Sequence, residues 1–211
     1  MAYHPLLTED TGTQGAGKRQ IEVSVDATRD RASASRSTQT NLIATYGLTP
    51  KVDVQLGTSH VRHESRDTSL ELKWQVLEAD GWTMALKPGV TVATGGRANY
   101  GAVAVVGYES GGWEFYGHLG ARRNRNTRGE RGALYQVSAS TIWEARERFW
   151  LVAEAGVLRQ PDPAVRSQPE FLGVGLIWGP TKDLDLDLGW RRGVNATASE
   201  RTLDAGITLR W

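Results

Sequence analysis

The sequence predicts an all-β fold: a transmembrane antiparallel up-and-down β-barrel of the outer-membrane type, with about 12 strands of roughly ten residues. Apolar side chains recur at every second position between turn signals, and a period of two places them on one face of a strand. Tight connections alternate with longer polar ones, and aromatic residues gather beside the tight turns. These three observations together are typical of outer-membrane barrels.

Composition narrows the classes of protein. The 211 residues suit one all-β domain, and the absence of Cys excludes disulfides and thiolate metal sites. No run of about 20 apolar residues exists, which excludes a spanning helix but not a spanning barrel. The net charge of +1 gives no overall attraction to nucleic acid. We expect no metal, no cofactor and no nucleic-acid partner.

The chain divides into residues 1–17 and 18–211. Residues 3–17 are polar, Gly-rich and without periodicity, so we expect either an irregular periplasmic lead-in or a plug in the barrel lumen. Residues 18–211 are expected to form the barrel. Met1 and Ala2 look like an expression start on a mature sequence, and we expect the native precursor to carry a leader.

Alternation places the strands in order. Pro88 shares the apolar parity of its strand, and because Pro cannot donate to the ladder we expect a bulge or kink there. The sixth strand has Ala and Val on both faces, and we place Tyr108 outward. The strands are expected near 18–29, 38–48, 52–56, 70–76, 82–92, 100–109, 113–121, 133–144, 149–159, 170–178, 184–190 and 200–211.

The last strand ends on Trp211. Pairing of this strand with the first would leave no open edge. A terminal strand that ends in an aromatic residue resembles the signal by which the barrel-assembly machinery recognises outer-membrane barrels. An even strand number with tight periplasmic turns puts both termini in the periplasm.

Residues 4–17, HPLLTEDTGTQGAG, followed by KRQIEVSVD, resemble the start of outer-membrane proteins of the MetA-pathway of phenol degradation family. The resemblance implies a passive outer-membrane channel or transporter for small molecules, with a role in uptake of aromatic or other hydrophobic compounds. The matching positions are Pro5, Leu6, Thr8, Glu9, Asp10, Gly12, Gly15, Gly17 and Glu22.

Two asymmetries support the barrel. Aromatic residues on the apolar parity sit near the tight turns, as in an interfacial girdle: Tyr46, Trp82, Tyr108, Trp113, Trp143, Phe149, Trp178 and Trp211. The loop end has a formal balance of +9, from 16 of the 20 Arg and seven acids, against −8 for the rest. One interpretation is that these charges simply keep the loops solvated. The other is that the arginines form a rim that binds lipopolysaccharide phosphates and attracts anionic solutes. The rim candidates are Arg123, Arg125, Arg128 and Arg131.

The parity opposite to the apolar one gives the predicted lumen. Its mixed charges are expected to pair across the interior, and about twelve strands leave room for a narrow pore. The lumen candidates for solute binding are Glu22, Asp26, Asp53, Glu71, Lys73, Lys87, Glu114, His118, Arg122, Glu154, Asp185, Asp187, Arg191, Asp204 and Arg210.

Other functions remain open at this point. His63, Ser65 and Glu71 share a face near one hairpin, which is similar to the lipid A deacylases of the outer membrane. Their parity points inward or into the loop, away from lipid, so we expect no enzyme. A closed structural barrel that transports nothing is a third possibility, and a soluble β-sandwich is the alternative fold.

Overall fold

The protein forms a closed barrel of twelve antiparallel strands and contains no helix among the residues described. In this computed structural model those residues are 4–61, 66–94, 96–125 and 129–211. They therefore include no helix of the length and apolarity needed to cross a membrane. The strands are β1 (Arg19–Arg29), β2 (Arg36–Thr49), β3 (Val52–Val61), β4 (Arg66–Ala79), β5 (Trp82–Ala93), β6 (Ala98–Ser110), β7 (Trp113–Arg123), β8 (Ala133–Arg146), β9 (Phe149–Leu158), β10 (Glu170–Trp178), β11 (Leu184–Gly193) and β12 (Arg201–Arg210).

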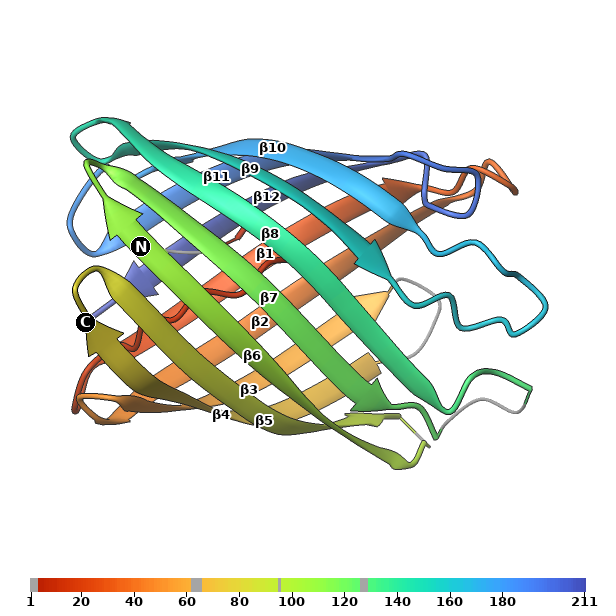
Figure 1. Ribbon diagram of the computed structural model, residues 1–211, viewed down its shortest axis with the longest axis horizontal. Coiled ribbons are helices and arrows are strands. Elements are labelled where there is room, and N and C mark those ends of the chain that lie inside the picture. The colour runs from red at the N-terminus through yellow and green to blue at the C-terminus, as the bar shows by residue number, and fades with distance from the viewer. Residues whose placement is uncertain (1–3, 62–65, 95, 126–128) are drawn as a thin grey trace.

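Each strand pairs with its neighbours in sequence, and β1 closes the barrel by pairing with β12. The closing register runs from Gln20 opposite Arg210 to Arg29 opposite Arg201. Figure 1 shows short connections at the end where the C-terminus lies and longer loops at the other end. We call these two ends the turn rim and the loop rim. The predicted fold, strand number and alternation of connections are confirmed.

Two of the short connections follow from their residue types. Asp80 and Gly81 both have positive φ, as do Gly111 and Gly112. Two-residue hairpins with this backbone match the right-handed twist of the strands they join, and Asp-Gly and Gly-Gly adopt it at low cost. The sequence therefore specifies where these hairpins turn.

The bulge expected at Pro88 is wrong. Pro88 stands opposite Ala102 in an unbroken register with β6, and the pairs with β4 on either side keep a constant register. The irregularity in β4 lies instead between Gln75 and Leu77, beside the turn rim. Bulges are common at barrel rims, where they bend a strand without disturbing the wall.

The outer face is an apolar surface. Leu56, Leu119 and Leu172 are each more than half exposed, and many other large apolar residues on this parity are exposed as well. A continuous apolar surface on all sides of the molecule is rare among monomeric proteins in water. Val106 is 40% exposed and Val105 only 3%, so the ambiguous sixth strand has the parity that was predicted for it.

The predicted girdle residues lie near the turn rim on this outer face. Six of the eight are exposed, and Tyr108 and Phe149 are half-buried. Trp82 pairs with Tyr108 at 4.8 Å between ring centroids, and Trp113 stacks on Trp143 at 5.5 Å. In each pair the two residues stand directly opposite each other on neighbouring strands. Side chains in such positions are close enough to stabilise the sheet by cross-strand contact.

Candidate channel interior

The fifteen predicted lumen residues occupy the strand positions opposite to the exposed apolar face. Fourteen of them are buried or half-buried, and Arg122 near the loop rim is exposed. They pair mainly with one another or with residues 4–14. Arg210 contacts Asp185 at 2.7 Å, and Glu114 accepts a hydrogen bond from Tyr116 at 2.8 Å. Glu22 lines a cavity that is described below.

Residues 4–17, which we call the N-terminal segment, run inside this polar interior. Figure 1 shows the segment as the red trace visible between the strands. Thr8, Asp10 and Thr11 are at most 3% exposed. Groups this deep lose their water and need partners in the protein, and four sets of contacts supply them.

The first set surrounds His4. Its imidazole contacts Asp187 on β11 through Nδ1 and lies 3.4 Å from Asp26 on β1 through Nε2. Pro5 follows, and it packs where Gly175 and Gly189 face each other on β10 and β11. A Cβ on Gly189 would lie 2.5 Å from the Pro5 ring. The absence of side chains at these glycines is what admits the segment here.

The second set is centred on Glu154 of β9, which is 5% exposed. Its Oε2 accepts hydrogen bonds from the backbone N–H of Leu7 at 2.9 Å and of Thr8 at 3.1 Å. Its Oε1 lies 3.3 Å from Nε of Arg191, which also contacts Asp204 at 3.5 Å. One wall carboxylate therefore joins the segment to the ionic network of the barrel.

The third set is a group of charges on β4 and β5. Lys73, which is 3% exposed, contacts Asp10 at 2.7 Å and Glu9 at 3.3 Å. Lys87 contacts Glu9 and lies 3.3 Å from Glu71. A buried lysine is tolerated only with such partners, so the two acids of the segment compensate cations that the wall has buried.

The fourth set lies toward the turn rim. Thr11 bonds Thr83 at 2.7 Å, and the N–H of Gln14 donates to Asp53 at 2.8 Å. Gly15 then passes so close to β2 that a Cβ on Gly47 would lie 1.9 Å from its carbonyl oxygen. Only glycine fits at position 47 while the segment lies there.

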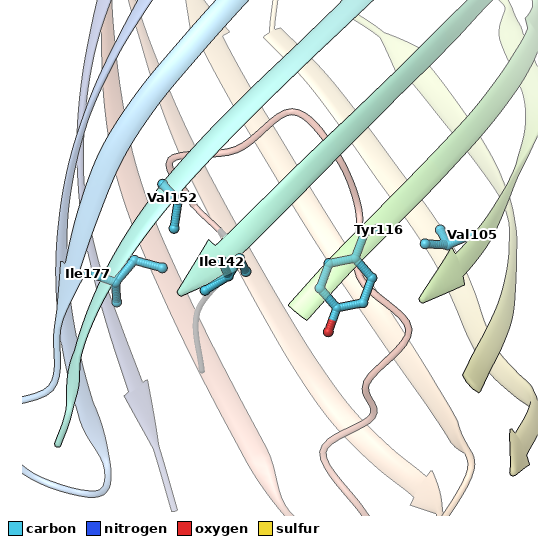
Figure 2. Packing of buried hydrophobic residues seen from close by; sticks show 5 residues of the cluster. All are labelled: Val105, Tyr116, Ile142, Val152 and Ile177. Atoms are coloured by element: carbon cyan, nitrogen blue, oxygen red, sulfur yellow. The ribbon is translucent and has the colours of Figure 1, made fainter. Parts of the chain in front are cut away.

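One part of the inner face is apolar. Val105, Tyr116, Ile142, Val152 and Ile177 from β6 to β10 form a buried cluster (Figure 2), with Leu6, Val103 and Trp150 packed against it. Leu6 belongs to the N-terminal segment, so the segment has an apolar contact as well as polar ones. The sequence reasoning missed this cluster, because it treated the whole lumen as polar.

Two large cavities lie beside the segment. The inner cavity, about 730 Å³, runs along β1 to β3 and reaches Lys182 and Trp211 at the turn rim. The outer cavity, about 500 Å³, reaches Arg159 and Pro161 at the loop rim. Glu9 and Lys87 line both cavities, so their ion pair lies between the two.

The loop rim holds three of its four predicted arginines among the described residues, and Arg128 lies outside them. Arg123 and Arg125 are exposed. Arg131 is half-buried, and its guanidinium donates to the carbonyls of Gln160 and Pro163 at 3.1 and 3.2 Å. Arg131 therefore holds two loops together instead of standing free at the rim.

Neither the enzyme alternative nor a metal site gains support from this geometry. His63 and Ser65 lie outside the described residues, and Glu71 faces the lumen with Lys87 as its partner. Among the described residues no group of three or more His, Asp or Glu side chains is arranged to hold a metal ion.

Comparison with known proteins gives the family. The model of the family described as "Putative MetA-pathway of phenol degradation" matches residues 7–211. The chain belongs to this family. Several of the residues that carried the resemblance in the sequence, among them Leu6, Glu9 and Asp10, contact the barrel interior.

Among curated proteins, none matches this member of the MetA-pathway family. Solved structures share its fold. The KdgM porin in complex with disordered oligogalacturonate superposes with a TM-score of 0.72 at 7% identity, covering 90% of this chain and 98% of that one. The COG4313 outer membrane channel from Pseudomonas putida F1 gives 0.70 at 11% identity, covering 98% and 100%. The NanC porin gives 0.70 at 9%, covering 90% and 98%. At these identities the likeness concerns the fold, a barrel of the outer-membrane type.

Proposed function

We propose that the protein is a passive outer-membrane channel for small molecules, whose lumen is narrowed by its own residues 4–17. The observation that carries this proposal is the pair of cavities that extend from the two rims and are separated by the Glu9–Lys87 ion pair. A purely structural barrel has no need of such spaces. Displacement of one 14-residue segment would join them into a path from rim to rim.

Aromatic or hydrophobic compounds are the solutes that fit best. The family description refers to phenol degradation, and the buried apolar cluster from Val105 to Ile177 would line one wall of the lumen once the segment, whose Leu6 packs against it, is displaced. The inner cavity with its polar side chains on the side of β1 to β3 and the apolar side chains on the side of β6 to β10 would suit solutes that carry both polar and apolar groups.

Ion conductance in planar bilayers tests the channel. The refolded full chain is compared with bilayers that received detergent alone. Steady current steps are the expected result. Protein that is shown to be folded, by its resistance to SDS at room temperature, and that gives no current would contradict the proposal and favour a closed structural barrel.

We also propose the orientation and the lipid contacts. The turn rim and both termini would face the periplasm, with the girdle at that interface. Arg123 and Arg125 would meet lipopolysaccharide phosphates, since guanidinium groups suit phosphate. Outer-membrane lipids would cover the apolar face, and the barrel-assembly machinery would recognise the strand that ends on Trp211.

Labelling of single cysteines tests this orientation cleanly, because the chain has no Cys. On intact cells a membrane-impermeant maleimide should label Arg166→Cys in a long loop and spare Asp80→Cys in a tight turn. The reverse pattern would overturn the orientation. We propose no catalysis, and Ser65→Ala should leave lipid A unchanged.

A further inference from the structure

The outer cavity is created by three glycines on the inner face. Gly89 and Gly101 stand directly opposite each other on β5 and β6, and Gly120 on β7 pairs with Val103, two residues along β6. Without side chains at these neighbouring positions the wall is hollowed, which gives a space of about 500 Å³. That volume lies in the range that pockets for small molecules occupy.

The side chain of His118 presents an N–H donor to this space through Nε2. The backbone N–H of Glu9 donates to Nδ1 of His118 at 3.0 Å, and a ring nitrogen that accepts a hydrogen bond cannot carry the proton. The proton of a neutral His118 is therefore on Nε2, which has no partner among the described residues. A Cβ on Gly120 would lie 2.8 Å from this atom, so the missing side chain is what leaves Nε2 accessible.

Positive charge lines the same cavity. Arg122 and Arg159 both border it, and within the described part of the chain neither has a carboxylate within ion-pair distance. The guanidinium of Arg159 lies over the Tyr135 ring, 5.5 Å from its centre. The two carboxylates of the cavity, Glu9 and Glu71, are already paired with Lys87. An anion in this space would therefore meet the guanidinium of Arg122 without competition from a neighbouring carboxylate.

Part of the remaining wall is apolar, beside the polar side chains of Thr91, Asn99 and Gln136. Val103, Leu134 and Leu158 line the cavity, and each is half-buried. Apolar walls with a few convergent polar groups are typical of sites that bind small organic molecules. Neither a bare inorganic anion nor a neutral hydrocarbon would use both features.

We propose that the outer cavity binds a small organic anion with an apolar body, such as an aromatic carboxylate, with its charged group at Arg122 and His118 and its ring against Leu134 and Leu158. This inference rests on the proposed channel function only in treating the bound anion as a transported solute. Binding itself does not require transport.

Binding of benzoate to the full chain in detergent micelles tests the site. Ligand-observed NMR measures this binding, and the signal from empty micelles is subtracted. Benzamide has the same ring without the charge, and acetate has the charge without the ring. We expect benzoate to bind about tenfold more tightly than either. Arg122→Gln should abolish the preference for benzoate over benzamide. Arg192→Gln, an exposed loop-rim arginine that does not line the cavity, should preserve it.

A second variant fills the cavity without changing charge. Gly120→Ala should weaken both ring ligands, because its Cβ would meet the His118 ring. Equal binding of benzoate and benzamide, or equal effects of Arg122→Gln and Arg192→Gln, would overturn the inference. Current without benzoate binding would refute this site and leave the channel standing. Benzoate binding without current would support this site and contradict the channel.

Discussion

Neutralising the two acids of the N-terminal segment is expected to release it from the barrel wall. In the double variant Glu9→Gln/Asp10→Asn, Lys73 loses partners at 3.3 and 2.7 Å while only 3% of its side chain is exposed. Removing one partner of a buried ion pair costs about 3–5 kcal/mol. This cost falls on the docked state, because water can reach the lysines once the segment leaves.

The cost of removing these partners of the lysine determines how far the docking equilibrium of the segment shifts. Since about 1.4 kcal/mol corresponds to a factor of ten, the ratio of docked to undocked segment should fall by roughly 10²- to 4 × 10³-fold. Single-channel recording should show it as a larger fraction of time at the higher conductance level. Limited proteolysis should show it as cleavage near residues 9–14 that the unmodified protein resists.

A matched double variant controls for charge. Glu78→Gln/Asp80→Asn also removes two acids, but Glu78 is 61% exposed and its contact with Lys51 is 4.0 Å long. Exposed pairs of this kind contribute little, and Asn tolerates the positive φ at residue 80. The reasoning fails if Glu9→Gln/Asp10→Asn conducts and resists protease just as the unmodified protein does.

Three further predictions concern residues on the barrel strands. Gly47→Ala should raise conductance, because its Cβ would stand 1.9 Å from the Gly15 carbonyl oxygen and backbone must move; unchanged current would count against the docked segment. Ile142→Ala should lower the free energy of unfolding by about 2–5 kcal/mol, since Ile142 has no exposed surface; a negligible loss in urea titrations would mean that water fills this level of the lumen. Trp113→Ala should remove about 0.5–1.5 kcal/mol from the stacked pair with Trp143, beyond the loss of buried area; equal stability of Trp113→Ala and Trp113→Phe would contradict a specific pair.

The strands could be predicted from sequence because a barrel wall imposes one rule on every strand. Lipid outside and polar groups inside produce an alternation that can be read locally, as in Leu184 to Trp190. The rule weakens where the interior is itself apolar. In β6 and β8 to β10, Val105, Ile142, Val152 and Ile177 lie inside, so both parities are apolar and the cluster leaves no signature in the pattern.

The contacts of the N-terminal segment could not be derived from sequence. They join residues that are distant in the chain, such as His4 and Asp187, which are 183 positions apart. No periodicity links such pairs, and charged residues in an irregular segment are equally compatible with a solvated tail. The signal that could have helped was the excess of glycines on the inner parity, because Gly175 and Gly189 make room for a backbone that a solvated tail would not need.

Residues 4–17 are proposed to narrow a channel that runs through the barrel. The most direct test compares the single-channel conductance of the full chain with that of a variant lacking residues 1–17, both refolded and both shown to be folded. We expect steady conductance that rises on deletion, because the inner and outer cavities then join. Conductance unaffected by the deletion would contradict the role of the segment, and its absence from both proteins would contradict the channel itself.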